Sequence, residues 1–345
     1  MRRAMVLITP QTRALLDAIE EPALLVGDQR ITAANGSARE LLGARVEGSD
    51  IRLAIRHPEA LEHILAGHSG KIAIVGLDGA ERPWELSVTS LGDDAQLVRL
   101  TDRSAARAAE RMRVDFVANA SHELRTPLAT ISGYAETLSE PGEIDADIRT
   151  RFGQTIHAEA RRMLRIVEDL MSLSRIEADR FVMPQGQVQL DEIARIAAEN
   201  GGPLAEARGC RIQVEIEADL PPVAGDFAQL LQLADNLVAN AIRYGCGKNA
   251  CDISIVVERD RARAALIVRD TGEGIAAIHL PRLTERFYRI DAARSRDAGG
   301  TGLGLAIVKH IVERHRGSLE INSTPGRGTE VVVRLAFASD PPPLS

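Results

Sequence analysis

The sequence is poor in cysteine. Cys210, Cys246 and Cys251 are the three cysteines in 345 residues, and so small and odd a number does not make a disulfide framework. We therefore expect reduced thiols that act as small apolar filler, as in cytosolic proteins. Cys246 and Cys251 also lack the two-residue spacing of zinc or redox pairs, so a metal site at these positions is not expected.

The sequence also lacks a basic excess and long apolar runs. Lys and Arg number 42 against 49 Asp and Glu, which gives a net charge of -7. Nucleic-acid-binding domains usually carry a basic excess, so we expect no nucleic-acid partner. No stretch reaches the ~18 consecutive apolar residues of a membrane helix. We expect a cytoplasmic chain, and the sequence leaves peripheral membrane association open.

What is present is an ordinary globular composition, with 45% apolar and 26% charged residues. This length suggests two or three domains. We expect a multidomain α+β chain with a sensor unit at 9–104, a helical hairpin at 105–179, a linker at 180–187, a two-layer α/β unit at 188–338 and a frayed tail at 339–345. The first unit has short strands, a helical middle and three more antiparallel strands, an order that resembles a PAS domain.

Two long helical patterns follow the first unit. Apolar residues recur every three or four positions from Phe116 to Leu138 and again from Ile148 to Leu173, separated by a turn that contains Pro and Gly. One hairpin cannot bury both apolar stripes, so we expect a homodimer in which two hairpins form a four-helix bundle. The alternative is a hairpin that packs on the other domains of its own chain.

The last unit mixes helix and strand patterns. We expect antiparallel neighbours in a two-layer arrangement. The expected helices are at 190–207, 227–244 and 303–315, and the expected strands are at 211–216, 252–258, 264–269, 318–322 and 330–337.

The first chemical motif is SHELRTPL on the first long helix. His122 lies about 200° from the buried stripe around the helix, so it should point outward. Glu123 is adjacent, Thr126 lies one turn further on the same face, and Pro127 interrupts the helical pattern. A carboxylate can hold the imidazole tautomer and raise its basicity, which favours a nucleophilic histidine over an idle surface one.

The second motif places two amides on one helix. Asn236 and Asn240 are four residues apart, and Arg243 is about one turn beyond Asn240. Amide oxygens suit Mg²⁺ together with phosphate oxygens, and Arg pairs with phosphate. The alternative, two capping or surface amides, explains either Asn alone better than it explains the set.

Glycines mark two further motifs. In VRDTGEGI, Asp270 ends a strand, and Gly272 and Gly274 let the backbone approach a ligand closely. The Asp270 carboxylate could accept a hydrogen bond from an exocyclic amine of that ligand. The string also matches G-x-G-x-x-A, but no βαβ unit follows it, which argues against a dinucleotide site.

In GGTGLGLAIVKHI, a glycine cluster runs into a helix and forms an anion cradle that is not a P-loop. The segment 285–300 between them is long enough to act as a lid.

The ordered set of histidine helix, Asn helix, D-T-G-E-G, F-Y-R, G-T-G-L-G-L and G-R-G-T resembles the sensor histidine kinases of two-component signalling, over about 107–337. The run from PRLTERFYR to HRGSLEI resembles the phosphate-regulon sensor kinases among them. The resemblance implies a C-terminal ATP-binding sandwich of the histidine-kinase, gyrase and Hsp90 type. It also implies ATP and Mg²⁺ as cofactors and the receiver domain of a response regulator as partner.

The resemblance also implies residue roles. His122 would accept the γ-phosphoryl group, Glu123 would act as general base, and Thr126 would position water for dephosphorylation of the regulator. Asn240 would bind Mg²⁺ with help from Asn236. The residues implied in ATP binding are Asn236, Asn240, Arg243, Tyr244, Asp270, Gly272, Gly274, Phe287, Arg289, Gly300, Thr301, Gly302, Leu303, Gly304 and Thr329.

Two departures from the family pattern and two competing functions remain. Relatives commonly have Lys where this chain has Arg243, which keeps the charge but changes its reach. Phosphate sensors usually have N-terminal membrane helices, which are missing here.

An ATPase of the same fold without phosphohistidine is one alternative, and SHELRTPL argues against it. A non-catalytic scaffold is the other, and it predicts no ATP binding.

Overall fold

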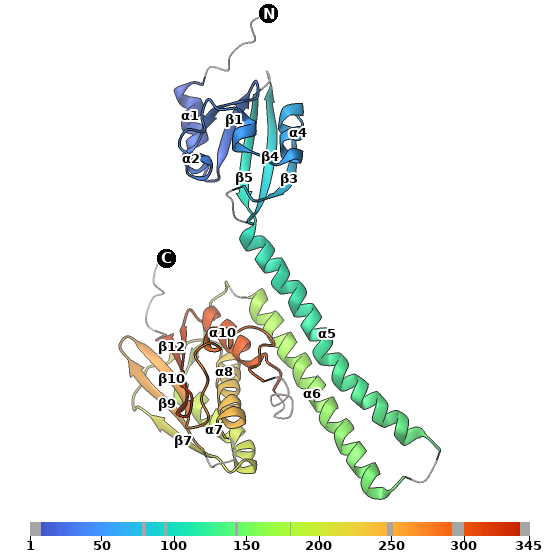
Figure 1. Cartoon of the computed structure of the whole chain (residues 1–345). Helices are drawn as coiled ribbons and strands as arrows, with labels where there is room; N and C mark the ends of the chain where they lie inside the picture. Colours follow the sequence, from blue (N-terminus) through green and yellow to red (C-terminus); the bar gives the residue numbers. More distant parts are fainter. Residues whose placement is uncertain are drawn as a thin grey trace, which may run out of the picture. The chain divides into compact units, whose positions relative to one another are not determined.

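The computed structural model describes residues 8–77, 81–92, 95–141, 144–179, 181–246, 251–291 and 300–338. The chain divides into two compact units, Met1–Val117 and Ala118–Ser345, and each is described by itself (Figure 1). The expected tail at 339–345 and the middle of the expected lid, 292–299, lie outside the described residues. No helix within the described ranges combines the length and apolar character needed to cross a bilayer.

The first unit is built on an antiparallel sheet with strand order β2-β1-β5-β4-β3. Its strands are β1 (Ala23–Gly27), β2 (Arg30–Ala34), β3 (Gly70–Val75), β4 (Pro83–Gly92) and β5 (Ala95–Asp102). Its helices are α1 (Pro10–Asp17), α2 (Gly36–Leu42), α3 (Ile51–Ala54) and α4 (Pro58–Ala66). The elements follow the order expected of a PAS domain, with two short strands, a helical middle and three more antiparallel strands.

The core of this unit lies between the sheet and its helices. Leu86 and Leu100 face each other across β4 and β5 and are fully buried. The buried Asn35 begins α2, and its Oδ1 accepts hydrogen bonds from the N–H groups of Ala38 (2.9 Å) and Ala23 (3.0 Å). Each donor would otherwise be an unpaired buried N–H, so this Asn joins the helix to the sheet.

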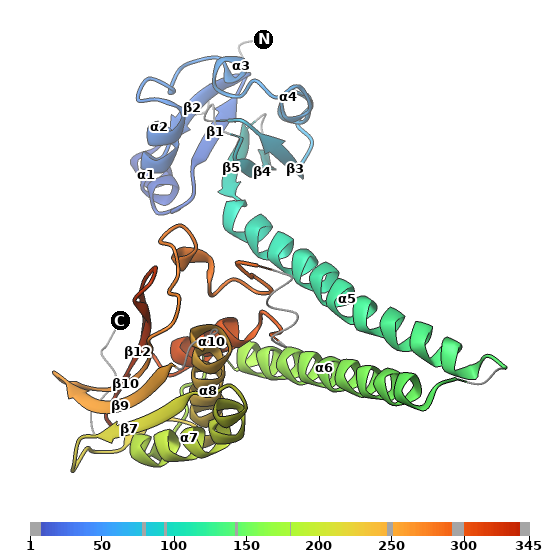
Figure 2. The ribbon, with the colours of Figure 1, turned by 60° about the horizontal axis from the view of Figure 1, so that its bottom comes forward.

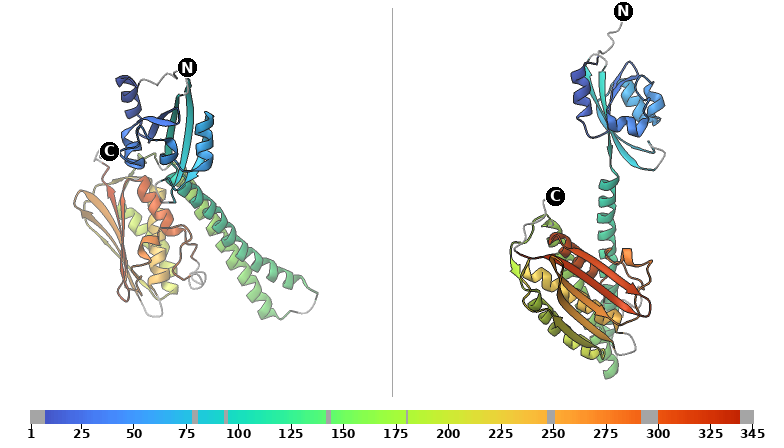
Figure 3. Two further views of the ribbon diagram at one scale, coloured as in Figure 1. Left: turned by 45° about the horizontal axis from the view of Figure 1, so that its top comes forward. Right: turned by 90° about the vertical axis from the view of Figure 1, so that its left-hand side faces the viewer.

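Two long helices, α5 (Ser104–Ser139) and α6 (Ala146–Ala178), run side by side in opposite directions (Figure 3). α5 passes through Pro127 without ending. α6 begins at Asp145, whose carboxylate accepts from the N–H of Asp147 at 2.8 Å. The rings of Tyr134 and Phe152 stack across the hairpin with their centroids 4.6 Å apart. The expected hairpin is therefore present.

The rest of the second unit is a two-layer α/β sandwich. Its main sheet has strand order β11-β12-β10-β9-β7, and α7, α8 and α10 cover one face of it (Figure 2). The helices are α7 (Leu190–Ala207), α8 (Phe227–Asn240) and α10 (Gly304–Arg314). The strands are β7 (Arg211–Ile216), β9 (Asp252–Asp260), β10 (Arg263–Asp270), β11 (Ser318–Thr324) and β12 (Gly328–Ala336).

Three expectations for this sandwich were wrong in detail. β7 pairs with β9 in parallel, because the chain between them crosses over through α8 before it returns. The end of the expected linker forms β6 (Gln187–Val188), which pairs with β8 (Val223–Ala224). The helix expected to reach 244 is α-helical only to Asn240 and continues as a π-helix, η1 (Ala241–Gly245). Such π segments often occur at functional sites.

Candidate active site

A cavity of about 690 Å³ lies in the second unit, within the usual size range of small-molecule sites. It is bounded by α8 and η1, by the end of β10, by the segment around 288–291 and by the glycine turn before α10. The sequence-predicted residues that line it are Asn236, Asn240, Arg243, Tyr244, Asp270, Gly274, Arg289, Gly300, Thr301, Gly302, Gly304 and Thr329. Of the residues predicted to bind ATP, three do not line it: Gly272, Phe287 and Leu303.

These last three residues shape the walls of the cavity. A Cβ atom on Gly272 would lie 2.3 Å from the carbonyl oxygen of Gly245, so only glycine fits there. Phe287 has a φ of 62°, and its N–H donates to the Gly302 carbonyl at 2.8 Å, which joins the lid segment to the glycine turn. Leu303 is fully buried directly before α10. They act through packing and backbone bonds.

The asparagine helix faces the start of α10. Asn236 and Asn240 are both half-buried and line the cavity. Asn236 Nδ2 donates to the carbonyl of Gln232 at 2.9 Å, and the Asn236 Oδ1 atom takes no part in that hydrogen bond. A Cβ atom on Gly304 would meet Asn236 Oδ1 at 2.8 Å, so the missing side chain of Gly304 lets the two helices approach. Both amides and the N-terminal end of α10 therefore meet at one place, as a phosphate and cation site requires.

Asp270 lines the cavity from the end of β10. Its Oδ1 accepts from the N–H of Gly272 at 2.9 Å. Burial raises the pKa of the Asp270 carboxyl, and the N–H groups of Gly272 and Thr329 partly oppose that shift. Gly245 packs directly against it, since a Cβ atom there would lie 2.6 Å from Asp270 Cγ. A carboxylate held in this way accepts a hydrogen bond from an amine in a fixed direction.

His122 lies on α5 and is exposed, as its helical position predicts. Thr126 Oγ1 donates to the His122 carbonyl at 3.3 Å, and Pro127 is buried one residue further on. Neither His122 nor Thr126 lines the cavity. The His122 side chain is therefore accessible, but it is not part of the cavity wall.

Glu123 has partners that the sequence did not suggest. Its Oε2 accepts from Arg162 on α6 and from Arg289 of the lid segment, each at 3.0 Å. Both guanidinium side chains are nearly buried, at 9% and 6% exposure. Glu123 thus joins the hairpin to the cavity wall and neutralises an arginine that lines the cavity.

Further contacts dock the sandwich on α6. Thr301 Oγ1 in the glycine turn donates to Asp169 Oδ2 at 2.7 Å, and Ser172 Oγ donates to Gln232 Oε1 on α8 at 2.7 Å. Burial raises the pKa of Asp169, which the Thr301 hydrogen bond opposes. Sequence reasoning missed Asp169 because an acidic residue on a long helix is normally a solvated one, and no local pattern names a distant partner.

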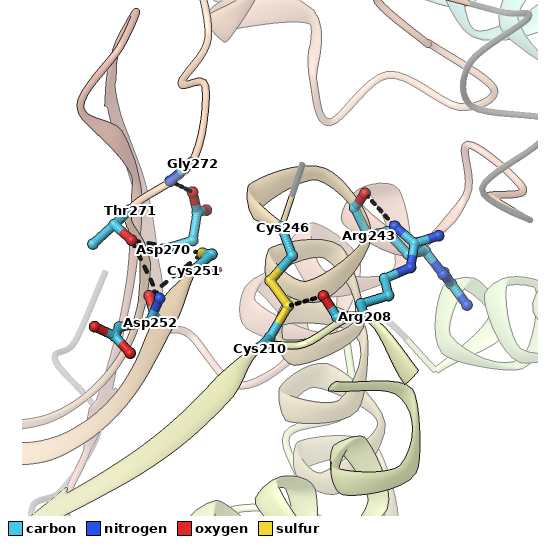
Figure 4. The surroundings of a disulfide bond; sticks show 9 residues. All are labelled: Arg208, Cys210, Arg243, Cys246, Cys251, Asp252, Asp270, Thr271 and Gly272. Carbon is cyan, nitrogen blue, oxygen red and sulfur yellow. Dashed lines mark hydrogen bonds between the residues drawn. A yellow bond between two sulfur atoms is a disulfide. The ribbon is translucent and has the colours of Figure 1, made fainter. Parts of the chain in front are cut away.

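The expectation of reduced filler cysteines was wrong for two of the three. Cys210 and Cys246 form a disulfide with their Cα atoms 6.4 Å apart (Figure 4). Cys251 is a free, buried thiol. The count of cysteines could not reveal the bridge, because the two residues are 36 positions apart and meet only through the crossover around α8.

Comparison with known families gives three matches along the chain. A PAS domain model matches residues 11–72, and a His Kinase A (phospho-acceptor) domain model matches residues 112–179. The model for the histidine kinase-, DNA gyrase B- and HSP90-like ATPases matches residues 225–339. The matched ranges follow the PAS-like sheet, the helical hairpin and the cavity-bearing sandwich in that order.

Individual relatives agree with these matches. The phosphate regulon sensor protein PhoR of Pseudomonas aeruginosa is 36% identical over 336 residues, which cover 96% of this chain and 74% of that protein. The sensor-like histidine kinase SenX3 of Mycolicibacterium smegmatis is 37% identical over 255 residues, or 71% of this chain and 63% of that protein. The solved complex of the histidine kinase ThkA with the response regulator protein TrrA aligns over 94% of this chain at 16% identity with a TM-score of 0.52, a likeness of fold.

Proposed function

The chain belongs to the sensor histidine kinase family, and from this premise we propose that its cavity binds ATP with Mg²⁺ and that His122 receives the γ-phosphoryl group. One observation carries the proposal. The amides of α8, the half-buried Asp270 and the glycine turn before α10 surround a single cavity, in the same unit as an exposed histidine on α5.

The residues of the cavity fit a nucleotide from end to end. Asp270 would accept from the exocyclic amine of adenine, since its position is fixed by the Gly272 N–H. The glycine turn and the start of α10 would take the phosphates on backbone N–H groups. Burial lowers the pKa of the Arg243 guanidinium, but arginine is basic enough to stay protonated at neutral pH, so Arg243 supplies a positive charge at the cavity wall.

The donor set also suits a magnesium ion. Asn240, with Asn236 beside it, offers amide oxygens at the phosphate end of the cavity. A bound Mg²⁺ ion would neutralise phosphate charge during transfer. The two asparagines hold this place because α8 presents both amides on one face.

His122 would act as the nucleophile. A neutral imidazole nitrogen attacks phosphorus in line with the leaving group, and Glu123 would hold the proton on the other nitrogen. In the docked arrangement Glu123 Oε2 is bonded to Arg162 and Arg289, and in the proposed reaction Glu123 would exchange these partners for His122. The sandwich must therefore reorient on the hairpin before transfer.

The phosphoryl group would then pass to an aspartate in the receiver domain of a response regulator. We also propose the reverse activity, in which Thr126 positions water to dephosphorylate that regulator. Similarity to a phosphate regulon sensor protein supports signalling of the phosphate-regulon type. The homodimer would form through the hairpin, where apolar side chains such as Leu128 (52% exposed) and Leu164 (62% exposed) lack cover within one chain.

Incubation of the full chain with γ-labelled ATP and Mg²⁺ tests the proposal. We expect label on the protein that is stable to alkali and labile to acid, and that is lost in His122→Gln. His157→Gln is the matched control, because His157 is also exposed on the hairpin, and it should label normally. ATP turnover without protein label would instead favour the ATPase alternative, and failure to bind ATP would favour the scaffold.

A further inference from the structure

The disulfide lies at the end of the asparagine helix. Cys210 is in the turn between α7 and β7, and Cys246 directly follows the π-helix η1 (Figure 4). The segment that the bridge closes contains the whole of α8, whose amides line the cavity. The bridge therefore restrains the C-terminal end of a cavity-forming helix against the neighbouring helix–strand turn.

Gly245 links this restraint to the adenine end of the cavity. It precedes Cys246, and a Cβ atom built on it would lie 2.6 Å from Asp270 Cγ. On its other side, a Cβ atom on Gly272 would lie 2.4 Å from the Gly245 Cα. Backbone packed this closely cannot shift without moving its neighbours. A displacement of Cys246 therefore reaches Asp270 through one residue.

A second connection runs in parallel with the bridge. Arg208, two residues before Cys210, donates from Nη1 to the carbonyl of Arg243 at 2.9 Å. Arg243 belongs to η1 and lines the cavity. The turn that carries Cys210 is thus joined to η1 by one covalent bond and one hydrogen bond, and the covalent one is chemically reversible.

We propose that Cys210 and Cys246 form a reversible redox modification site, and that the disulfide holds the ATP cavity in its binding shape. The inference rests on the proposed binding of ATP in that cavity. It assigns the bridge a function that a merely stabilising cross-link does not have, because the oxidation state would change nucleotide affinity.

A dithiol is the class of reductant that this site would take. Its first thiolate attacks the sulfur of Cys210, which is half-buried, in preference to that of Cys246, which is 4% exposed. The Cys210–Cys246 bond breaks, a mixed disulfide forms on Cys210, and the Cys246 thiolate takes up a proton. The second thiol of the reductant then displaces Cys210. The protein gains two electrons and two protons, and the reductant becomes a disulfide.

Reduction should weaken ATP binding. With the bridge open, Gly245 and Cys246 gain conformational freedom that ATP binding must remove again, which costs affinity. We expect a loss of at least about fivefold, the lower end of the usual coupling between linked sites.

The test measures MgATP binding to the full chain by titration calorimetry, before and after treatment with dithiothreitol, with differential alkylation and peptide mapping of each sample. The expected result is a linked Cys210–Cys246 peptide before treatment and an affinity at least about fivefold lower after it. Equal affinities in the two mapped states, or no linked peptide in the oxidised protein, would overturn the inference. Absence of ATP binding in both states would instead remove the proposed function on which it rests.

Two variants separate the bridge from a general thiol effect. Cys210→Ser should bind ATP with the affinity of the reduced protein and no longer respond to dithiothreitol. Cys251→Ala is the matched control, because Cys251 is a free thiol outside the bridge, and it should keep the full response. Loss of the response in Cys251→Ala would show that the assigned pair is wrong. If circular dichroism shows that Cys210→Ser is unfolded, the comparison of oxidised and reduced wild-type protein decides.

Discussion

Removal of the Asp169 carboxylate should release the cavity-bearing sandwich from the hairpin. Asp169 Oδ2 accepts a 2.7 Å hydrogen bond from Thr301, a residue that is only 8% exposed. A hydrogen bond to an ionised group contributes about 1.5–3 kcal/mol, or about 10- to 150-fold in an equilibrium. Burial raises the pKa of the Asp169 carboxyl and so works against its ionised form, and we take the lower end of this range. We expect Asp169→Ala to shift the docking equilibrium about tenfold towards release.

Release should accelerate autophosphorylation. In the docked arrangement His122 does not line the cavity, and Glu123 is bonded to Arg162 and Arg289. Transfer requires the released arrangement, so the rate follows its population while that population is small. At saturating ATP, Asp169→Ala should therefore form phosphohistidine about tenfold faster than the wild type.

Glu168→Ala is the matched control. Glu168 is the neighbour of Asp169 on α6 and lines the same cavity, but among the described residues it has no hydrogen bond to the sandwich. Both variants remove one negative charge near the phosphate site, so a rate increase shared by both reports charge alone. Phosphohistidine formation is followed with γ-labelled ATP, and ATP affinity is measured separately. If Asp169→Ala forms phosphohistidine no faster than Glu168→Ala, the Asp169–Thr301 hydrogen bond does not hold the sandwich in the docked arrangement.

Three further predictions concern other parts of the second unit. Asp270→Asn leaves one acceptor oxygen where the carboxylate has two, so either the Gly272 N–H or the adenine amine loses its acceptor and ATP affinity should fall about 10- to 150-fold in calorimetry. An unchanged affinity would remove Asp270 from the adenine site. Burial lowers the pKa of His315 from its usual 6.5, so the unfolded chain binds that proton first as the pH falls. The free energy of unfolding should then decrease below pH 6.5 by up to about 1.4 kcal/mol per pH unit, and urea titrations of His315→Gln should show a smaller slope. Val167→Glu places a charge on the exposed stripe of α6, and light scattering should show monomers where the wild type gives dimers.

Local patterns in the sequence predict most of the second unit. α7 and β7 have the expected bounds, Leu190–Ala207 and Arg211–Ile216, because each is a strongly periodic segment with a clear boundary residue. The cavity residues follow for a similar reason. The glycines and the two amides carry chemistry that depends on short spacings, and a short spacing is readable along the chain.

Pairings between distant segments could not be predicted in this way. Cys210 and Cys246 looked like filler because nothing near either residue specifies a partner 36 positions away. The parallel pairing of β7 with β9 depends on how the α8 crossover packs, which is a tertiary property. Arg162 and Asp169 are charged residues on a long helix, and only their tertiary partners, Glu123 on α5 and Thr301 in the sandwich, distinguish them from solvated ones.

The contacts of Glu123 would compete with phosphoryl transfer if Glu123 and Arg289 have the proposed roles. In the proposed reaction Glu123 must hold a proton of His122, and Arg289 must face the phosphates. The 3.0 Å bond between them uses both groups at once, and Arg162 holds the same Glu123 oxygen from α6. An ion pair with guanidinium groups this buried is strongly destabilised when one partner is withdrawn, unless each group finds a new partner in the same step. ATP phosphates can supply the partner for Arg289, and His122 can supply the partner for Glu123. In the proposed reaction, release of the hairpin would therefore be coupled to an occupied cavity, and the histidine would be activated when a phosphoryl donor is in place.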